Sequence, residues 1–139
     1  LEVSLSNFES QTQNNILTGA WIEFVGSEIR YEGSNNLNSP SAHEDNLELL
    51  TNGAARSVMR AIKGQGAGVS SVVWGNQEEL TNQFSSEDFD SKNDVVENGA
   101  IKLHVPGSTA KDATTYKATL LWDLTTTPNG DVGDEENNI

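Results

Sequence analysis

The 139-residue chain has 21 acidic and 8 basic residues, a net charge of −13, and no cysteine. Its length suits one domain with its own core, whereas its charge disfavours nucleic acid and anionic membranes as partners. The absence of cysteine excludes disulfides, thiol nucleophiles and thiolate metal sites. No apolar run reaches the roughly 20 residues of a membrane span. Because the sequence starts without Met inside a strand-like segment, we expect a trimmed fragment of a secreted protein.

The first 25 residues contain two apolar segments that predict β-strands. Leu1, Val3 and Leu5 alternate with polar residues, which is the period of a half-buried strand. Residues 16–25 alternate in the same way, and the face that we expect to be buried consists of Ala20, Ile22 and Phe24.

The middle of the chain is divided by clusters of Gly, Asn, Ser and Pro. We expect strands at Ser27–Tyr31, Arg56–Ile62 and Val69–Trp74, and a loop at Gly33–Ala42. The segment Glu44–Thr51 is ambiguous between a helical turn and a strand. The glycines at 64, 66 and 68 resemble a phosphate-binding loop only superficially, because a Val-rich segment follows them where such a loop needs a helix. A glycine turn or bulge is expected there.

The longest irregular region is Gly75–Gly99, which we expect Phe84 and Phe89 to pin to the body of the domain. Its acidic residues are weak candidates for a Ca²⁺ site, since hard cations prefer carboxylate and amide oxygens. These candidates are Asp88, Asp90 and Asp94, together with Asn93. The segment has neither the central Gly nor the terminal Glu of an EF-hand loop, so we assign no metal and no other cofactor to the chain.

Two strands near the C-terminus are the best defined. Ile101–Val105 alternates apolar and polar residues between two turn signals, and Tyr116–Leu124 forms a longer alternating strand. We expect one face of the longer strand to be apolar: Tyr116, Ala118, Leu120, Trp122 and Leu124. Residues 129–139 follow as an acidic tail. The pattern predicts an all-β fold, a single-domain antiparallel β-sandwich or partly closed barrel with long polar loops.

Catalytic constellations are scarce in this sequence. Only His43 and His104 are available as imidazole bases, and no serine lies in a nucleophile-elbow motif. His104 shares the Lys102 face of its strand and is expected to be solvated. Most carboxylates lie in polar loops, whereas catalytic pKa tuning needs apolar surroundings. We therefore expect that the protein is not an enzyme.

The three tryptophans are more informative, because an exposed indole can stack on a sugar ring or anchor a partner. Trp122 is in register with the apolar face of its strand, which predicts a core position. Trp21 shares a face with Glu23, so partial exposure is expected, and Trp74 at a strand end is compatible with either environment.

Several blocks of the chain resemble the WxL domain family. Residues 115–124, read as Thr-Tyr-Lys-Ala-Thr-Leu-Leu-Trp-Asp-Leu and followed by a Thr run and Pro128, closely resemble the end of that domain. The name of the family comes from the Trp-x-Leu seen here as Trp122-Asp123-Leu124. Residues 17–22, 61–75 and 101–106 are similar to its Leu-x-Gly-Ala strand, its glycine-rich stretch ending in Trp-Gly and its penultimate strand. The resemblance covers residues 1–128.

The resemblance implies a secreted domain on the surface of Gram-positive bacteria that attaches non-covalently to the cell wall, with peptidoglycan as ligand. It also implies assembly with a WxL-interacting protein and with other WxL proteins. The binding candidates that it and the aromatic pattern provide are Trp122, Leu124, Trp21, Trp74 and Tyr116.

The chain departs from the family pattern in three places. The earlier Trp-x-Leu of the family is missing, and Leu1 stands where that motif would end, which predicts a truncated N-terminus. Thr114 occupies the position of the Gly that usually precedes Thr-Tyr, and an acidic tail follows the Pro.

Three functions remain open at this point. The first is a wall-attachment and assembly module, and the second is a protein–protein module that binds a WxL-interacting protein or another WxL chain. In the second case a partner strand would add to the last strand, at Thr119, Leu121 and Thr125 or along its edge. The third is a carbohydrate-active enzyme, which would need two carboxylates roughly 5–10 Å apart in a cleft.

Overall fold

The structure is a computed structural model, and it describes residues 1–42 and 46–126. Its described strands form antiparallel pairs in two three-stranded and two two-stranded sheets, without a closed barrel. The predicted all-β sandwich is therefore confirmed, and the barrel alternative is not. The predicted acidic tail, and His43, Glu44 and Asp45 before the fifth strand, lie outside the described residues.

One three-stranded sheet has the order β10-β1-β6, formed by Leu120–Asp123, Glu2–Leu5 and Arg56–Ser57. The other has the order β5-β2-β9, formed by Asn46–Leu50, Trp21–Val25 and Ile101–His104. The two sheets approach each other most closely where β5 lies against β1 and β6. The strands β9 and β10 are consequently the edge strands on the side away from this contact.

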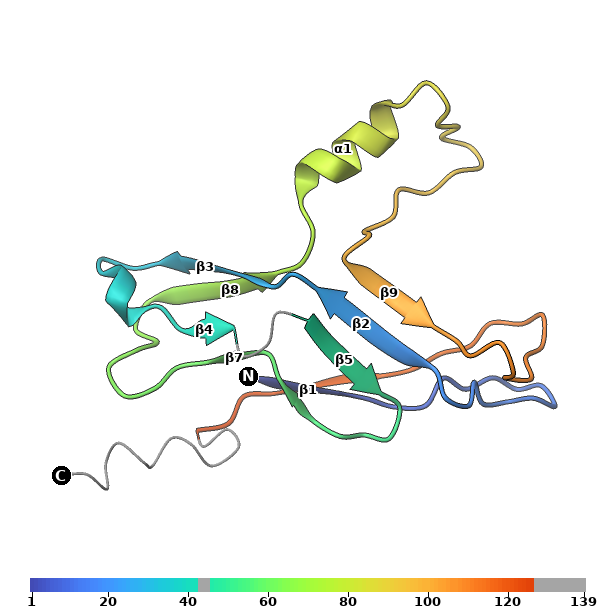
Figure 1. The fold of residues 1–139 in the computed structure, drawn as a ribbon, viewed down its shortest axis with the longest axis horizontal. Helices are drawn as coiled ribbons and strands as arrows, with labels where there is room; N and C mark the ends of the chain where they lie inside the picture. Colours follow the sequence, from blue (N-terminus) through green and yellow to red (C-terminus); the bar gives the residue numbers. More distant parts are fainter. Residues whose placement is uncertain (43–45, 127–139) are drawn as a thin grey trace.

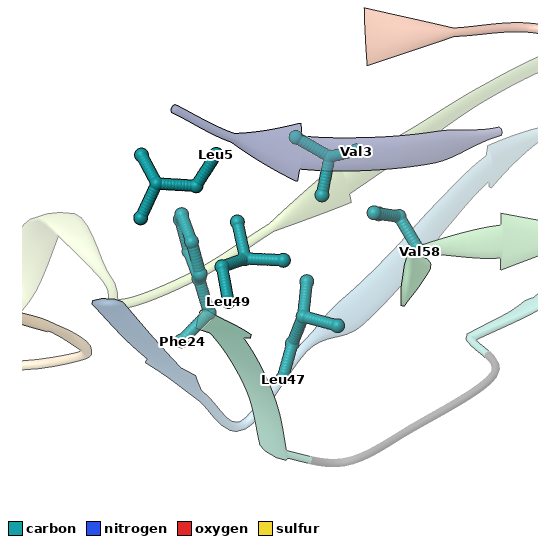
Figure 2. Packing of buried hydrophobic residues seen from close by; sticks show 6 residues of the cluster. All are labelled: Val3, Leu5, Phe24, Leu47, Leu49 and Val58. Atoms are coloured by element: carbon teal, nitrogen blue, oxygen red, sulfur yellow. The ribbon is translucent and has the colours of Figure 1, made fainter. Parts of the chain in front are cut away.

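The core lies between these two sheets (Figure 2). The side chains that fill it are Val3, Leu5, Phe24, Leu47, Leu49 and Val58. Val3 and Leu5 on β1 are buried, as the predicted alternation requires. Ala20, which directly precedes β2, and Phe24 on β2 are also buried as expected. Alternation places every second side chain between the layers, and the hydrophobic effect drives its burial there.

Two small ribbons extend the sandwich (Figure 1). In one, β3 (Glu28–Glu32) pairs with β8 (Val69–Val73), and in the other β4 (Ser41–Ala42) pairs with β7 (Met59–Arg60). The segment 33–42 is thus not only a loop, since it contains β4 and a 3₁₀ turn at Asn36–Asn38.

The strand predicted at 56–62 is divided at Val58. The backbone amides of Val58 and Met59 both donate to the carbonyl of Leu1, at 2.8 and 3.3 Å. Two donors on one acceptor kink the chain, which pairs with β1 before Val58 and with β4 after it.

The region predicted to be irregular, 75–99, contains a helix, α1 (Gln77–Ser85), which projects from the sandwich (Figure 1). The Asn76 side chain caps it by accepting a hydrogen bond from the Glu79 amide at 2.9 Å. Phe84 stays 61% exposed and its ring contacts that of Phe89, so the two rings pack on each other and do not pin the region to the core as predicted.

Candidate functional site

A cavity of about 450 Å³ lies where β7, the glycine-rich turn, the start of β8 and the segment after β10 come together. The residues that line it are Leu1, Pro40, Met59, Arg60, Ala61, Gly66, Gly68, Ser70, Leu124, Thr125 and Thr126. The cavity therefore joins two sequence blocks that lie more than 50 positions apart, the glycine-rich stretch and the Trp-x-Leu ending. Leu1, which the resemblance places at the end of an earlier Trp-x-Leu, lines the same cavity.

Glycine is required in one wall of this cavity. Gly66 and Gly68 have φ values of 92° and 105°, which L-residues rarely adopt. A Cβ at Gly68 would lie 3.0 Å from the carbonyl oxygen of Glu32, and one at Gly66 would lie 3.1 Å from the Cβ of Ala61. The turn expected from the glycine spacing is confirmed, and its lack of side chains leaves the space open.

The cavity is mainly apolar, but polar side chains also belong to its lining, among them those of Arg60, Ser70 and Thr125. Arg60 is the one charged side chain among the described residues that line it. The hydroxyl oxygens of Ser70 and Thr125 are buried without a hydrogen-bond partner in the described part of the chain. Leaving a buried hydroxyl unsatisfied costs about 1–3 kcal/mol. Such a cost is common where a ligand or ordered water supplies the missing partner.

The Trp-x-Leu strand lies at the edge of its sheet. Trp122 is opposite Val3 and therefore on the core-facing side, as the alternation predicts, but it is 44% exposed. Leu124 is 81% exposed. The expected core position of Trp122 is wrong, because β10 and β9 are edge strands beyond the closest contact of the sheets. Alternation indicates the side on which a residue lies but not whether another layer covers that side.

The strand predicted at 116–124 is also shorter than expected. The Thr119 amide donates to the side-chain hydroxyl of Ser6 at 2.7 Å, and only Lys117 forms a further isolated bridge, to Glu9. A side chain replaces a backbone acceptor in the ladder here, so regular pairing begins at Leu120.

Trp21 lies on the outer face of the second sheet, away from the cavity. Its ring stacks on that of His104, with centroids 4.6 Å apart and planes 9° from parallel. The Nε2 atom of His104 lies 3.2 Å from Oε1 of Glu23. His104 is thus held between two neighbours on β2 and is not the simply solvated residue that was expected, because the register of β9 on β2 places it directly opposite Trp21.

Trp74 and Tyr116 have structural contacts. The Trp74 ring packs on that of Phe24 with centroids 4.8 Å apart, at the margin of the core. The Tyr116 hydroxyl donates to the carbonyl of Asn14 at 2.7 Å and accepts from the Asp112 amide at 2.9 Å. Of the five binding candidates, only Leu124 lines the cavity.

The weak Ca²⁺ candidates do not form a cation site. Within the described residues, no group of three or more His, Cys, Asp or Glu side chains could hold a metal ion. The Asp90 carboxylate instead accepts hydrogen bonds from the Lys92 amide and the Asn93 side chain, and these lower its pKa. An Asp94 oxygen accepts from the Asp90 amide. These oxygens are used to build the loop.

Sequence reasoning missed the polar residues of the cavity, Arg60, Ser70 and Thr125. Arg60 directly precedes the glycine-rich stretch, Ser70 lies within it two residues after Gly68, and Thr125 directly follows the Trp-x-Leu. The available signal was that each of these residues lies within or next to a family motif in the sequence. The two motifs come together in space only because β10 pairs with β1.

An antiparallel β-sandwich that carries a mixed polar and apolar cavity is the architecture of a small binding module. The comparison with protein families gives the class a name: residues 1–128 match the family model described as WxL domain surface cell wall-binding, and the chain belongs to this family. The family is one of cell-wall-binding modules on the cell surface and not a catalytic one. Neither the curated proteins nor the solved structures gave a match. Among the described helices, none is long and apolar enough to cross a membrane.

Proposed function

We propose that this domain attaches a secreted protein non-covalently to the Gram-positive cell wall, that peptidoglycan is its ligand, and that the cavity beside Leu124 is the contact site. The observation that supports the proposal is the convergence of two separate family blocks, the glycine-rich turn and the Trp-x-Leu ending, on one cavity. A conformation that needs positive-φ glycines also favours a site where a ligand approaches the backbone closely.

Short-range contacts would have to provide the affinity. The chain has a net charge of −13, and a wall rich in anionic polymers repels it at long range. The lining of the cavity contains no carboxylate among its described residues, and Arg60 is its charged side chain. The same composition does not suit the carbohydrate-active enzyme considered above, since glycoside hydrolysis uses a pair of carboxylates at the bond that breaks.

Two leucines, one on β10 and one directly after it, allow a matched test. Leu124 lines the cavity and Leu121 does not, yet both are exposed, so replacing either with Gln should leave the fold intact. We expect Leu124→Gln to reduce sedimentation of the domain with purified peptidoglycan sacculi, from which teichoic acids have been removed. Leu121→Gln should sediment like the unmodified domain. Equal sedimentation of both variants would reject the cavity as the contact site.

A second function is favoured by the edge of the β10-β1-β6 sheet. Leu120, Leu121 and Trp122 on β10 are all exposed, and within the described residues β10 pairs with β1 alone. An unpaired strand edge with apolar side chains can accept a strand from another chain. We propose that a WxL-interacting protein or another WxL chain binds along this edge and so assembles the surface protein.

The two leucine variants also separate the two proposals. Leu121→Gln should weaken capture of the domain by the immobilised ectodomain of a WxL-interacting protein, and Leu124→Gln should not. The opposite pattern is expected with sacculi. If substitutions at Leu121 and at Trp122 both leave capture by the ectodomain unchanged, strand addition at β10 is contradicted.

A further inference from the structure

Residues 76–97, which comprise α1 with its cap and the loop after it, form an arm that stands apart from the sandwich (Figure 1). None of these residues is buried, and none packs against the core cluster. The arm is nevertheless built by specific contacts. The Gln83 side chain donates to the Glu97 carbonyl oxygen at 2.8 Å and accepts from the Glu97 amide at 3.0 Å, which fastens the end of the loop to the helix. The arm therefore has a defined shape but adds no buried residue to the core.

Apolar side chains on the arm are left uncovered. Phe84 is 61% exposed and Val95 is 79% exposed. The Phe84 ring packs on that of Phe89, with centroids 5.4 Å apart, and Leu80 lies one turn before Phe84 on the same face of α1. A helix of nine residues is marginal in water by itself and is normally stabilised by packing of its apolar face. This face of α1 is consequently suited to contact with another molecule.

A hollow of about 590 Å³ opens beside these rings, between the end of α1 and the loop. Phe89 and Val95 supply the apolar part of its lining. Three carboxylates also line it, those of Asp88, Asp94 and Glu97, and its described lining contains no Lys, Arg or His. A long cationic side chain matches this combination, because its aliphatic stem packs on apolar carbon while its charged head reaches the carboxylates. The face of an aromatic ring attracts the same cation.

The charge of the arm selects the partner for its apolar surface. The arm contains seven acidic residues and one lysine, so its net charge is −6 out of the −13 of the chain. All seven acidic side chains are exposed, and none forms an ion pair with a described residue. An anionic polymer would be repelled here, whereas a basic surface would be attracted and oriented. The complementary partner is therefore basic and carries apolar side chains.

We propose that the arm is a docking surface for a basic segment of a partner protein. A Lys or Arg of that segment enters the hollow, and an apolar residue beside it packs on Phe84 and Phe89. The site is separate from the cavity beside Leu124 and from the edge of β10, because no residue of the arm belongs to either. The inference goes beyond the proposed wall attachment and does not rest on it.

Synthetic peptides provide the first test. One peptide carries lysines and leucines on the same helical face, a second has glutamate for every lysine, and a third has serine for every leucine. The first should shift the backbone NMR signals of residues 77–97 and leave those of β1, β2 and β5 unchanged. The second should cause no shifts. The third should bind about tenfold more weakly, because the apolar contact is lost. Shifts outside the arm, or equal binding of the first and third peptides, would overturn the proposal.

Charge variants locate the cation. Asp88→Asn combined with Glu97→Gln removes two charges from the hollow, and the arm should keep its shape because these carboxylates accept no hydrogen bond from a described residue. Glu32→Gln combined with Asp123→Asn removes the same charge from exposed positions on β3 and β10. We expect the first pair to weaken binding of the lysine–leucine peptide about tenfold and the second pair to weaken it about twofold or less. Equal weakening would mean that net charge alone attracts the peptide and would reject the hollow.

A variant of the apolar surface has a matched control elsewhere in the chain. Phe84→Ser should weaken binding of the lysine–leucine peptide about tenfold. Leu37→Ser, at an 81% exposed position in the 3₁₀ turn Asn36–Asn38, should leave it unchanged. Because the arm adds no buried residue to the core, the melting temperature should stay that of the unmodified domain. If Phe84→Ser unwinds α1, the two charge pairs still decide.

Sacculi distinguish a protein partner from the wall as the occupant of the arm. The domain with Asp88→Asn and Glu97→Gln should sediment with purified sacculi like the unmodified domain, since the arm contributes no residue to the cavity beside Leu124. Loss of sedimentation in this variant would show that the carboxylates of the hollow bind amino groups of the wall, and it would overturn the assignment to a protein.

Discussion

Trp122 and Val3 are opposite each other on adjacent strands, and their side chains leave the sheet on the same side. Val3 is 1% exposed and Trp122 is 44% exposed, although the two are neighbours across one ladder. The boundary of the core therefore runs between β1 and β10. The signature tryptophan of the family lies just outside the core and contributes about half of its surface to packing.

This position predicts a modest stability effect of Trp122→Ala. Full burial makes Trp→Ala cost about 3–5 kcal/mol, so a half-buried ring should cost about 1–2 kcal/mol. Trp74 packs on Phe24 at the core margin, and Trp74→Ala should cost about 3 kcal/mol. Urea denaturation followed by circular dichroism measures both free energies of unfolding. A larger loss for Trp122→Ala than for Trp74→Ala would show that the edge strand is covered in solution.

The glycine-rich turn offers a second pair of variants. Gly64 and Gly68 both have positive φ, 89° and 105°, but a Cβ at Gly64 meets nothing within 4 Å, whereas one at Gly68 approaches the Glu32 carbonyl oxygen. Gly64→Ala should cost about 1–2 kcal/mol from backbone strain alone. Gly68→Ala should cost more, because the β3–β8 ribbon must also shift. Thermal unfolding of the two variants checks the order, and equal melting temperatures would refute the steric part of the explanation.

The sequence was sufficient for most of the strands but not for the helix. Residues 2–5 and 21–25 alternate clearly, and each forms a strand with the expected faces. Residues 101–104 also form the expected strand, but its apolar residues Ile101 and Leu103 are 43% and 53% exposed. In α1 only Leu80 and Phe84 are apolar on successive turns, so helical periodicity is weak. The capping pattern was nevertheless present, since Asn76 is followed three residues later by Glu79. Local hydrogen bonding at the helix start was the informative signal there, not hydrophobicity.

The candidate site was harder to predict for a different reason. The sequence identified the Trp-x-Leu and the glycine stretch as separate blocks, but their meeting depends on long-range pairing. Which side of an edge strand stays exposed also depends on the extent of the opposite sheet, as Trp122 shows. The residue type at one position does not indicate which strands pair or how far the opposite sheet extends.

Acid stability should depend on Asp112. Its carboxylate accepts hydrogen bonds from the Thr12 side chain and from the side chain and backbone amide of Asn14, and these hold its pKa below the ordinary value of 3.8. The contribution to stability is therefore complete above about pH 4 and is lost as pH falls through the lowered pKa. We expect Asp112→Asn to unfold with a shallower dependence on pH than the unmodified domain below pH 4.

A control for Asp112 is available in the same network. Tyr116→Phe deletes the hydroxyl that joins Asn14 to the Asp112 amide but keeps the carboxylate. It should lower the free energy of unfolding by a similar amount at pH 3 and at pH 7. An unchanged acid slope in Asp112→Asn, measured by urea titration at several pH values, would assign the acid sensitivity to other groups.

The salt dependence of wall binding is the last expectation, and it follows from where the charges lie. Contacts between exposed charges weaken steeply when ionic strength rises, since the screening length falls from about 30 Å at 0.01 M to about 8 Å at 0.15 M. Here Arg60 is the one charged side chain among the described cavity residues, and the other side chains that line the cavity are apolar or neutral polar groups. Screening also reduces the repulsion between an acidic domain and an anionic wall. Sedimentation with sacculi should therefore change little between low and moderate salt, and loss of most binding over that interval would show that surface charges hold the domain to the wall.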